Sequence, residues 1–244
     1  MRDLANGVAL VTGGAHRVGR ALVEALAHAG MRVAIHYNAA SAEADRLVAE
    51  LTATGHSAAA FGADLRDANA PSTLVDAVVD ELGALDLLVN SAAVMRRTPV
   101  DTVTVAEWDD MFALNLRAPF FLAQAAAPAL RRTRGSIINM ADLAAFETWP
   151  AYVPHTITKA AVVQMTRGLA RAFAPDIRVN AIAPGAVLLP EDWDEASRDH
   201  LIETTPLRRI GSPADVAEAA LYLARADYVT GEVLIVDGGR HVRS

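Results

Sequence analysis

Three side chains that could move a proton lie close together in this chain of 244 residues. Asp142 comes 13 residues before His155, and Lys159 follows His155 by four. Residues four apart share one face of a helix, so a substrate held over that face could meet both His155 and Lys159. Carboxylate, imidazole and amine groups are those that enzymes use for acid–base catalysis. On spacing alone, a surface histidine and lysine in a solvated first turn is the better explanation, so the choice depends on the rest of the chain.

Short apolar runs alternate with longer helical patterns along the chain. The apolar runs predict buried strands at residues 8–11, 33–35, 58–61, 85–89, 136–140, 179–182 and 233–236. Helical periodicity predicts helices at residues 18–29, 42–54, 72–82, 108–130, 152–173 and 213–224. We therefore expect one α/β domain over residues 1–244, a Rossmann-like doubly wound sheet of seven parallel strands with helices on both faces. Such sheets bind ligands at the carboxyl ends of their strands, where Asp142 is expected.

One polar segment, residues 186–212, interrupts this alternation. It contains Pro190, Trp193 and Pro206 and follows the sixth expected strand. Long connections of this kind inside a compact domain usually have a function. We expect this segment to form a lid over the substrate.

Composition and charge exclude several classes of function. The net charge is −7 and no basic stripe is present, which argues against nucleic acid as a partner. The chain has no cysteine, and its seven histidines lack paired ligand spacing, so we expect no metal site. The apolar runs are too short to cross a bilayer, and the first strand begins within ten residues of Met1, which leaves no room for a signal peptide. We expect a cytoplasmic protein with no membrane partner.

The first expected strand is followed by a glycine-rich turn, Thr12-Gly13-Gly14-Ala15-His16-Arg17-Val18-Gly19, that opens a helix. This context is typical of a dinucleotide site, because glycines let the backbone approach a pyrophosphate at a helix N-terminus. Arg17 occupies the position of the usual middle glycine and adds a positive charge near the expected phosphates. The alternative is a tight turn with no ligand. We expect cofactor contacts from Gly13, Ala15, His16, Arg17, Val18 and Gly19.

The end of the second expected strand indicates which dinucleotide binds. An acid at this place usually binds the ribose 2′-hydroxyl of NAD, but this chain has His36-Tyr37-Asn38 and then Ser41. No carboxylate would repel a 2′-phosphate there, so the segment favours NADPH over NADH. An exposed polar loop with no cofactor role is the alternative for His36, Tyr37 and Asn38.

Further motifs make the chain resemble a short-chain dehydrogenase/reductase over essentially its full length. The matching motifs are the glycine turn, Asp64-Leu65, Asn90-Ser91-Ala92, Asn115, Lys159, Pro184-Gly185 and Asp237-Gly238-Gly239. The resemblance implies NADPH/NADP as cofactor, with further contacts from Asp64, Leu65, Asn90, Ala92, Lys159, Pro184, Gly185 and Val187.

Within that family the chain is more similar to pteridine and dihydromonapterin reductases. These relatives carry an arginine as at Arg17, a histidine-containing segment as at His36-Tyr37, and an aspartate at the usual serine position, here Asp142. Some end in a motif like residues 237–241. The likeness implies a pterin as a candidate substrate.

The catalytic tyrosine of the family is replaced by His155. The resemblance implies that His155 donates a proton directly or through water, that Asp142 orients the substrate or relays protons, and that Lys159 holds the ribose. Asn115 would position a relay water. Lys159 disfavours a protonated imidazole and Asp142 favours one, so the sequence leaves the balance open. Tyr152 is an alternative donor that we assign to substrate contact, with packing as the equal alternative.

The substrate side departs from the pteridine reductases as well. Met95 stands where they place an aromatic side chain that stacks on the pterin. A thioether covers a flat ring less specifically than an aromatic face does. Trp149 or Trp193 could compensate from a loop, or either could only pack the lid. We expect Met95, Tyr152 and Trp193 to contact the substrate.

Three functions stay open on the sequence. The first is an NADPH-dependent reductase that passes hydride to a C=N or C=O group of a small molecule, with a pterin as candidate. The second is a carbonyl reductase acting on other substrates. The third is an NADP(H)-occupied binding or sensor protein without turnover, since the tyrosine is lost. In each case the resemblance implies a homotetramer or homodimer formed through helices 108–130 and 152–173.

Overall fold

A computed structural model describes residues 1–189 and 193–242. Its strands are β1 (Val8–Val11), β2 (Arg32–Tyr37), β3 (Ala58–Gly62), β4 (Leu87–Asn90), β5 (Ser136–Met140), β6 (Arg178–Pro184) and β7 (Val233–Val236). They form one sheet of seven strands in the order β3-β2-β1-β4-β5-β6-β7, and every neighbouring pair is parallel. The strand order reverses between β1 and β4, which is where such sheets bind ligands. The predicted doubly wound fold is confirmed.

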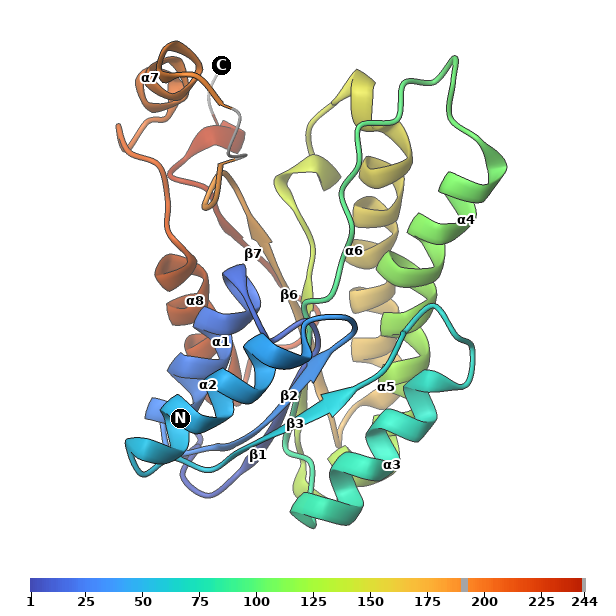
Figure 1. Ribbon diagram of the computed structural model, residues 1–244, viewed down its shortest axis with the longest axis vertical. Helices are drawn as coiled ribbons and strands as arrows, with labels where there is room; N and C mark the ends of the chain where they lie inside the picture. The colour runs from blue at the N-terminus through green and yellow to red at the C-terminus, as the bar shows by residue number, and fades with distance from the viewer. Residues whose placement is uncertain (190–192, 243–244) are drawn as a thin grey trace.

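Helices cover both faces of this sheet (Figure 1). They are α1 (Arg17–His28), α2 (Ser41–Ala53), α3 (Ala70–Leu82), α4 (Val105–Phe112), α5 (Ala118–Thr133), α6 (Val153–Phe173), α7 (Glu195–Thr204) and α8 (Pro213–Arg225). The apolar faces of α1, α2 and α8 pack on one side of the sheet, and those of α3, α5 and α6 pack on the other. Every residue of β1, β4 and β5 is buried, which explains why these strands are predominantly apolar.

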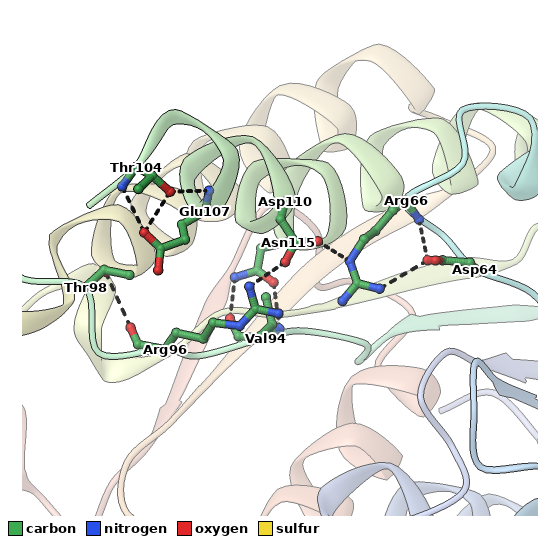
Figure 2. Close-up of polar contacts among 9 residues, drawn as sticks. All are labelled: Asp64, Arg66, Val94, Arg96, Thr98, Thr104, Glu107, Asp110 and Asn115. Carbon is green, nitrogen blue, oxygen red and sulfur yellow. Dashed lines mark hydrogen bonds and ion pairs between the residues drawn. The ribbon is translucent and has the colours of Figure 1, made fainter. Parts of the chain in front are cut away.

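The helix predicted at residues 108–130 is two helices joined by a π-helical turn at Ala113–Arg117. The first of them, α4, begins earlier than predicted because Thr104 and Glu107 form a capping box. The Thr104 hydroxyl accepts from the Glu107 backbone N–H at 3.2 Å, and the Glu107 carboxylate accepts from the Thr104 N–H at 2.8 Å (Figure 2). The π-helical turn contains Asn115, one of the predicted site residues.

The polar segment 186–212 contains a helix that the sequence analysis did not predict, α7. Its N-cap is Asp194, whose carboxylate accepts from the Ser197 N–H at 2.7 Å. Leu201 is its buried residue, and the helix stands away from the sheet beside the C-terminal end (Figure 1). Pro190 lies outside the described residues. The lid remains a prediction.

In residues 1–189 and 193–242, no helix combines the length and the apolar character needed to cross a membrane.

Candidate active site

The carboxyl ends of the central strands open into one cavity of about 550 Å³. The turn after β1, the end of β2, the loop after β4, the end of β5, α6 and the turn after β6 all contribute to its wall. The predicted site residues that line it are Gly13, Ala15, His16, Arg17, Val18, Gly19, His36, Tyr37, Asn38, Asp64, Leu65, Ala92, Met95, Asp142, His155, Lys159, Pro184, Gly185 and Val187. The fold therefore gathers most of the predicted residues at its switch point.

The glycine turn needs its glycines for two different reasons. Gly13 has φ +64°, a backbone region that residues with a side chain rarely adopt. A Cβ on Gly19 would lie 2.0 Å from the carbonyl oxygen of Gly13, so α1 can approach the turn only without one. Arg17 has φ +56°, which is unusual for a residue other than glycine, and strain of this kind concentrates at functional sites. The turn brings the N-terminus of α1 to the cavity wall.

The side chain of His36 supports this turn through hydrogen bonds. Its Nδ1 accepts from the backbone N–H of Gly13 at 3.1 Å, and its Nε2 lies 3.0 Å from the carbonyl oxygen of Ala63. These partners require the neutral tautomer with its proton on Nε2. The side chain is buried, and burial lowers the pKa of His36 below its usual value. The structure thus gives His36 a supporting role that its expected cofactor contact did not include.

Replacing His36 by leucine is expected to lower the free energy of unfolding by roughly 2 kcal/mol, because it leaves two buried backbone groups without partners. The pH dependence should change as well. Since the pKa of His36 is lowered in the folded chain, the unfolded chain binds more protons below about pH 6.5, and stability is lost as pH falls. Urea unfolding between about pH 5 and pH 7 measures both effects, and the variant should show a shallower acid slope. Equal stability and an unchanged slope would contradict the bracing role.

Asp142 and His155 meet at the cavity as predicted, the first after β5 and the second in the first turn of α6. One Asp142 oxygen accepts from the Ala144 N–H at 2.9 Å, and the other lies 3.5 Å from His155 Nε2. His155 is 2% exposed, and neither ring nitrogen has a hydrogen-bond partner among the described residues. A buried imidazole without partners beside a carboxylate is suited to bond a ligand or exchange a proton.

Lys159 lies one helical turn after His155 and is buried. Its ammonium donates to the carbonyl oxygen of Met140 at 2.8 Å. Burial lowers the pKa of Lys159, and the nearby carboxylate of Asp142 partly opposes that effect. The alternative of a solvated surface histidine and lysine is therefore wrong.

Lys159→Met is expected to stabilise the ligand-free protein by about 1 kcal/mol, because it removes a buried charge that has no close ion pair. The gain should exceed the loss of the hydrogen bond to Met140. Because the pKa of Lys159 is lowered, the difference should be largest near neutral pH and should shrink as pH rises toward 10.5. Urea unfolding of both proteins at neutral and alkaline pH measures it. A less stable variant at neutral pH would contradict the expectation.

Asn115 holds the loop after β4 and is not part of the cavity wall. Its amide accepts from the Val94 N–H and donates to the Val94 carbonyl, both at 2.9 Å (Figure 2). It also donates to the Thr158 hydroxyl at 3.3 Å, and that hydroxyl donates to the carbonyl of His155 at 2.7 Å. Asn115 thus connects the loop to the first turn of α6. Its role toward a relay water stays a prediction.

Asn90 is buried at the end of β4. Its amide donates to Asn139 on β5 at 2.9 Å. In the loop that follows Asn90, the N–H groups of Ser91 and Ala92 donate to the Thr12 hydroxyl at 2.9 and 3.0 Å. The expected cofactor contact of Asn90 is not seen in the cavity wall, and these residues instead fix the two loops that form it.

Of the three predicted substrate residues, the structure brings one to the cavity. Met95 lines it and is 49% exposed. Tyr152 packs edge-on against Trp149, with ring centroids 6.2 Å apart, which is the packing alternative. Trp193 is 44% exposed and is not part of the wall. The sequence could not show this, because the direction of a side chain from a loop depends on tertiary packing.

Ten residues of the wall were not predicted: Ala39, Ala40, Arg66, Ser91, Ala93, Val94, Leu114, Met140, Ala141 and Leu188. Most extend a predicted motif by one or two positions and have small or apolar side chains. Arg66 differs, because it is charged and follows directly after the predicted pair Asp64-Leu65. Its position next to that motif was a signal that could have been used.

The chain matches a family model described as Enoyl-(Acyl carrier protein) reductase over residues 13–241. It is 33% identical to the 3-oxoacyl-[acyl-carrier-protein] reductase FabG of Staphylococcus aureus, over 96% of this chain and 98% of that protein. Among solved structures, FolM alternative dihydrofolate reductase 1 from Brucella canis, complexed with NADP, is 34% identical with a TM-score of 0.93, and the match covers 100% of this chain and 97% of that one.

Two further solved structures agree. A mutant short-chain dehydrogenase/reductase from Serratia marcescens is 32% identical with a TM-score of 0.92, covering 98% of this chain and 100% of that one. A blue fluorescent protein from a metagenomic library, in complex with NADPH, is 34% identical with a TM-score of 0.91, covering 98% and 99% respectively. The fold, the site and these matches agree with the predicted resemblance, and the chain belongs to the short-chain dehydrogenase/reductase family of oxidoreductases.

Proposed function

We propose that this protein is an NADPH-dependent reductase that adds a hydride and a proton across a C=N or C=O bond of a small molecule, with His155 as the proton donor. The observation that carries the proposal is the buried imidazole of His155, which lies 3.5 Å from the carboxylate of Asp142 in the same cavity as the glycine turn. The turn suits a dinucleotide, because Gly13 and Gly19, which have no side chain, line the cavity at the N-terminus of α1. The backbone can therefore approach a pyrophosphate closely.

The charges around the turn favour a phosphorylated ribose. Arg17 and Asn38 both line the cavity, and α2 begins at Ser41, so its positive dipole end faces the same region. Residues 37–41 contain no carboxylate. Related structures hold NADP or NADPH, which supports the same choice here. When bound, NADPH supplies the hydride.

Arg17→Gly is expected to weaken NADPH binding about tenfold or more and to change NADH binding less than about threefold, because the lost guanidinium acts on the 2′-phosphate. Glycine adopts φ +56° without strain, so the turn should keep its shape. Fluorescence titration with each nucleotide measures the two affinities. An equal loss for both nucleotides would contradict a role in recognising the 2′-phosphate.

The geometry supports a route for the proton. Protonated His155 gives its proton to the substrate nitrogen or oxygen as the hydride reaches carbon, and the ring is left neutral. Asp142 stabilises the protonated ring across 3.5 Å and is 25% exposed, so it connects the buried ring to solvent for reprotonation. The Lys159 ammonium anchors the ribose side of the cavity.

The wall near Met95 suggests two substrate classes. Ala93 and Val94 make it apolar, which suits a flat ring. A pterin is the first class, supported by Arg17, Asp142 and the likeness to FolM. A carbonyl substrate is the second. It is favoured by the ketoacyl reductase relatives and by a described wall without phenylalanine or tryptophan.

NADPH oxidation against dihydropterins and a panel of small carbonyl compounds tests the proposal. Turnover of either class supports it and identifies the substrate. Tight NADPH binding with no turnover of any compound would contradict it and would favour the non-catalytic binding protein.

The helices predicted to form an oligomer carry exposed apolar side chains. Phe120 and Phe121 on α5 and Ile157 on α6 are each 41% exposed. We infer a homodimer or homotetramer through residues 108–130 and 152–173, which light scattering on the purified protein would test.

A further inference from the structure

Asp110 on α4 pairs with two arginines: Arg66, which lines the cavity, and Arg96, which lies next to the cavity residue Met95. One Asp110 carboxylate oxygen forms an ion pair with Arg66, 2.5 Å from its Nε, and the other accepts a hydrogen bond from Arg96 at 2.7 Å. Figure 2 shows Asp110 between the two guanidinium groups. Arg66 lines the cavity beside Asp64, to which it also donates at 3.3 Å, and Arg96 follows directly after Met95 on the substrate side.

The substrate-side segment has few other anchors. Residues 94–98 are held at one end by Asn115, which bonds both backbone groups of Val94, and at the other by the Thr98 N–H, which donates to Ala151 at 2.8 Å. Among the described residues, the pair between Arg96 and Asp110 is the side-chain contact that ties the middle of this segment to another element. Because Arg96 is the next residue along the chain, its pair with Asp110 also fixes the position of Met95, which lines the cavity.

Arg66 is fixed more firmly than Arg96. Its backbone carbonyl accepts from the Arg117 guanidinium, and its side chain forms ion pairs with both Asp64 and Asp110. The Asp110 carboxylate thus has one arginine on a rigid part of the wall and one on a loosely held segment. A rigid partner on one side lets the carboxylate set the position of the other.

We propose that Asp110 is a positioning residue: through Arg96 it holds the segment 94–98 and Met95 against the cavity, and so sets the affinity for substrate. Surface ion pairs contribute little to global stability, so the effect should appear in the segment and in KM. The statement about KM rests on the proposed reductase function. The statement about the segment does not.

The variant Asp110→Asn keeps the side-chain size and removes the charge. Hydrogen exchange of the Val94 and Thr98 amides, which are bonded to Asn115 and Ala151, should become at least severalfold faster in the ligand-free protein. The KM for substrate should rise about tenfold while kcat changes less than about twofold, because contacts that position substrate act on binding. The melting temperature should stay within about 2 °C of the unmodified protein.

Two neighbouring variants serve as controls. Asp109→Asn lies one residue away on α4, and Arg97→Gln lies beside Arg96. Neither Asp109 nor Arg97 makes a side-chain ion pair or hydrogen bond with a described residue, so both variants should behave as the unmodified protein. Arg96→Gln should reproduce the rise in KM of Asp110→Asn, and the double variant should show no further rise, because each single variant already removes the pair between Arg96 and Asp110.

Unchanged exchange at Val94 and Thr98 in Asp110→Asn would overturn the proposal, as would equal changes in Asp109→Asn. A protein with no turnover would sink the reductase function, and the exchange measurement would still decide the role of Asp110.

Discussion

Gly19→Ala is expected to weaken NADPH binding by at least about 100-fold, because the added methyl group would lie 2.0 Å from the carbonyl oxygen of Gly13. Both atoms belong to a short turn with no flexible side chain between them, so the backbone must move. A displacement of about 1 Å in groups that position a ligand can cost two orders of magnitude. Fluorescence titration with NADPH measures the loss.

Gly168→Ala is the matched control. Gly168 lies inside α6, and a Cβ there would meet no atom within 4 Å. This variant should bind NADPH as the unmodified protein does and should be more stable by up to about 1 kcal/mol, since alanine favours a helix. Binding by Gly19→Ala within threefold of the control would contradict the tight contact between α1 and the turn.

His155→Phe is expected to lower kcat at least about 100-fold and to leave NADPH affinity within about threefold. Phenylalanine fills a similar buried space but has no proton to give, while the glycine turn and Lys159 are untouched. Steady-state NADPH oxidation and fluorescence titration separate the two quantities. A kcat close to that of the unmodified protein would show that another group donates the proton.

The central strands could be predicted because the sheet is covered on both faces. A strand buried on both sides is predominantly apolar, and the runs at β1 and β5 were placed with the bounds that the structure shows. The bounds of the half-buried edge strand β7 were predicted as well. The ends of some strands were predicted less accurately. β2 runs from Arg32 to Tyr37, longer than predicted, because its polar ends still pair with neighbouring strands.

The error at residues 108–130 has two causes. The π-helical turn at Ala113–Arg117 has no distinctive local sequence, so the helical periodicity continues across it and predicts a single helix. The early start of α4 did have a signal, the Thr104–Glu107 capping box, which was not used. The helix α7 was missed because its polar sequence has no apolar stripe for periodicity to detect.

The candidate site also has a part that the sequence could predict and a part that it could not. Motifs of consecutive residues, such as the glycine turn, were predicted because their chemistry is local. The bond from Gly13 to His36 and the bridge from Arg66 through Asp110 to Arg96 connect residues far apart in the chain, so only the fold reveals them. Tyr152 and Trp193 do not line the cavity, and their contact with substrate stays a prediction.

The most direct test of the central claim, that His155 is the proton donor, is the pH profile of kcat for NADPH oxidation by the unmodified protein and by His155→Tyr. The account predicts turnover by the unmodified protein with a pH profile that differs from that of His155→Tyr, because a phenol replaces the imidazole as proton donor. Superimposable profiles would contradict the account. So would an inactive unmodified protein beside an active His155→Tyr variant, which would indicate a cofactor-binding protein that lacks its donor.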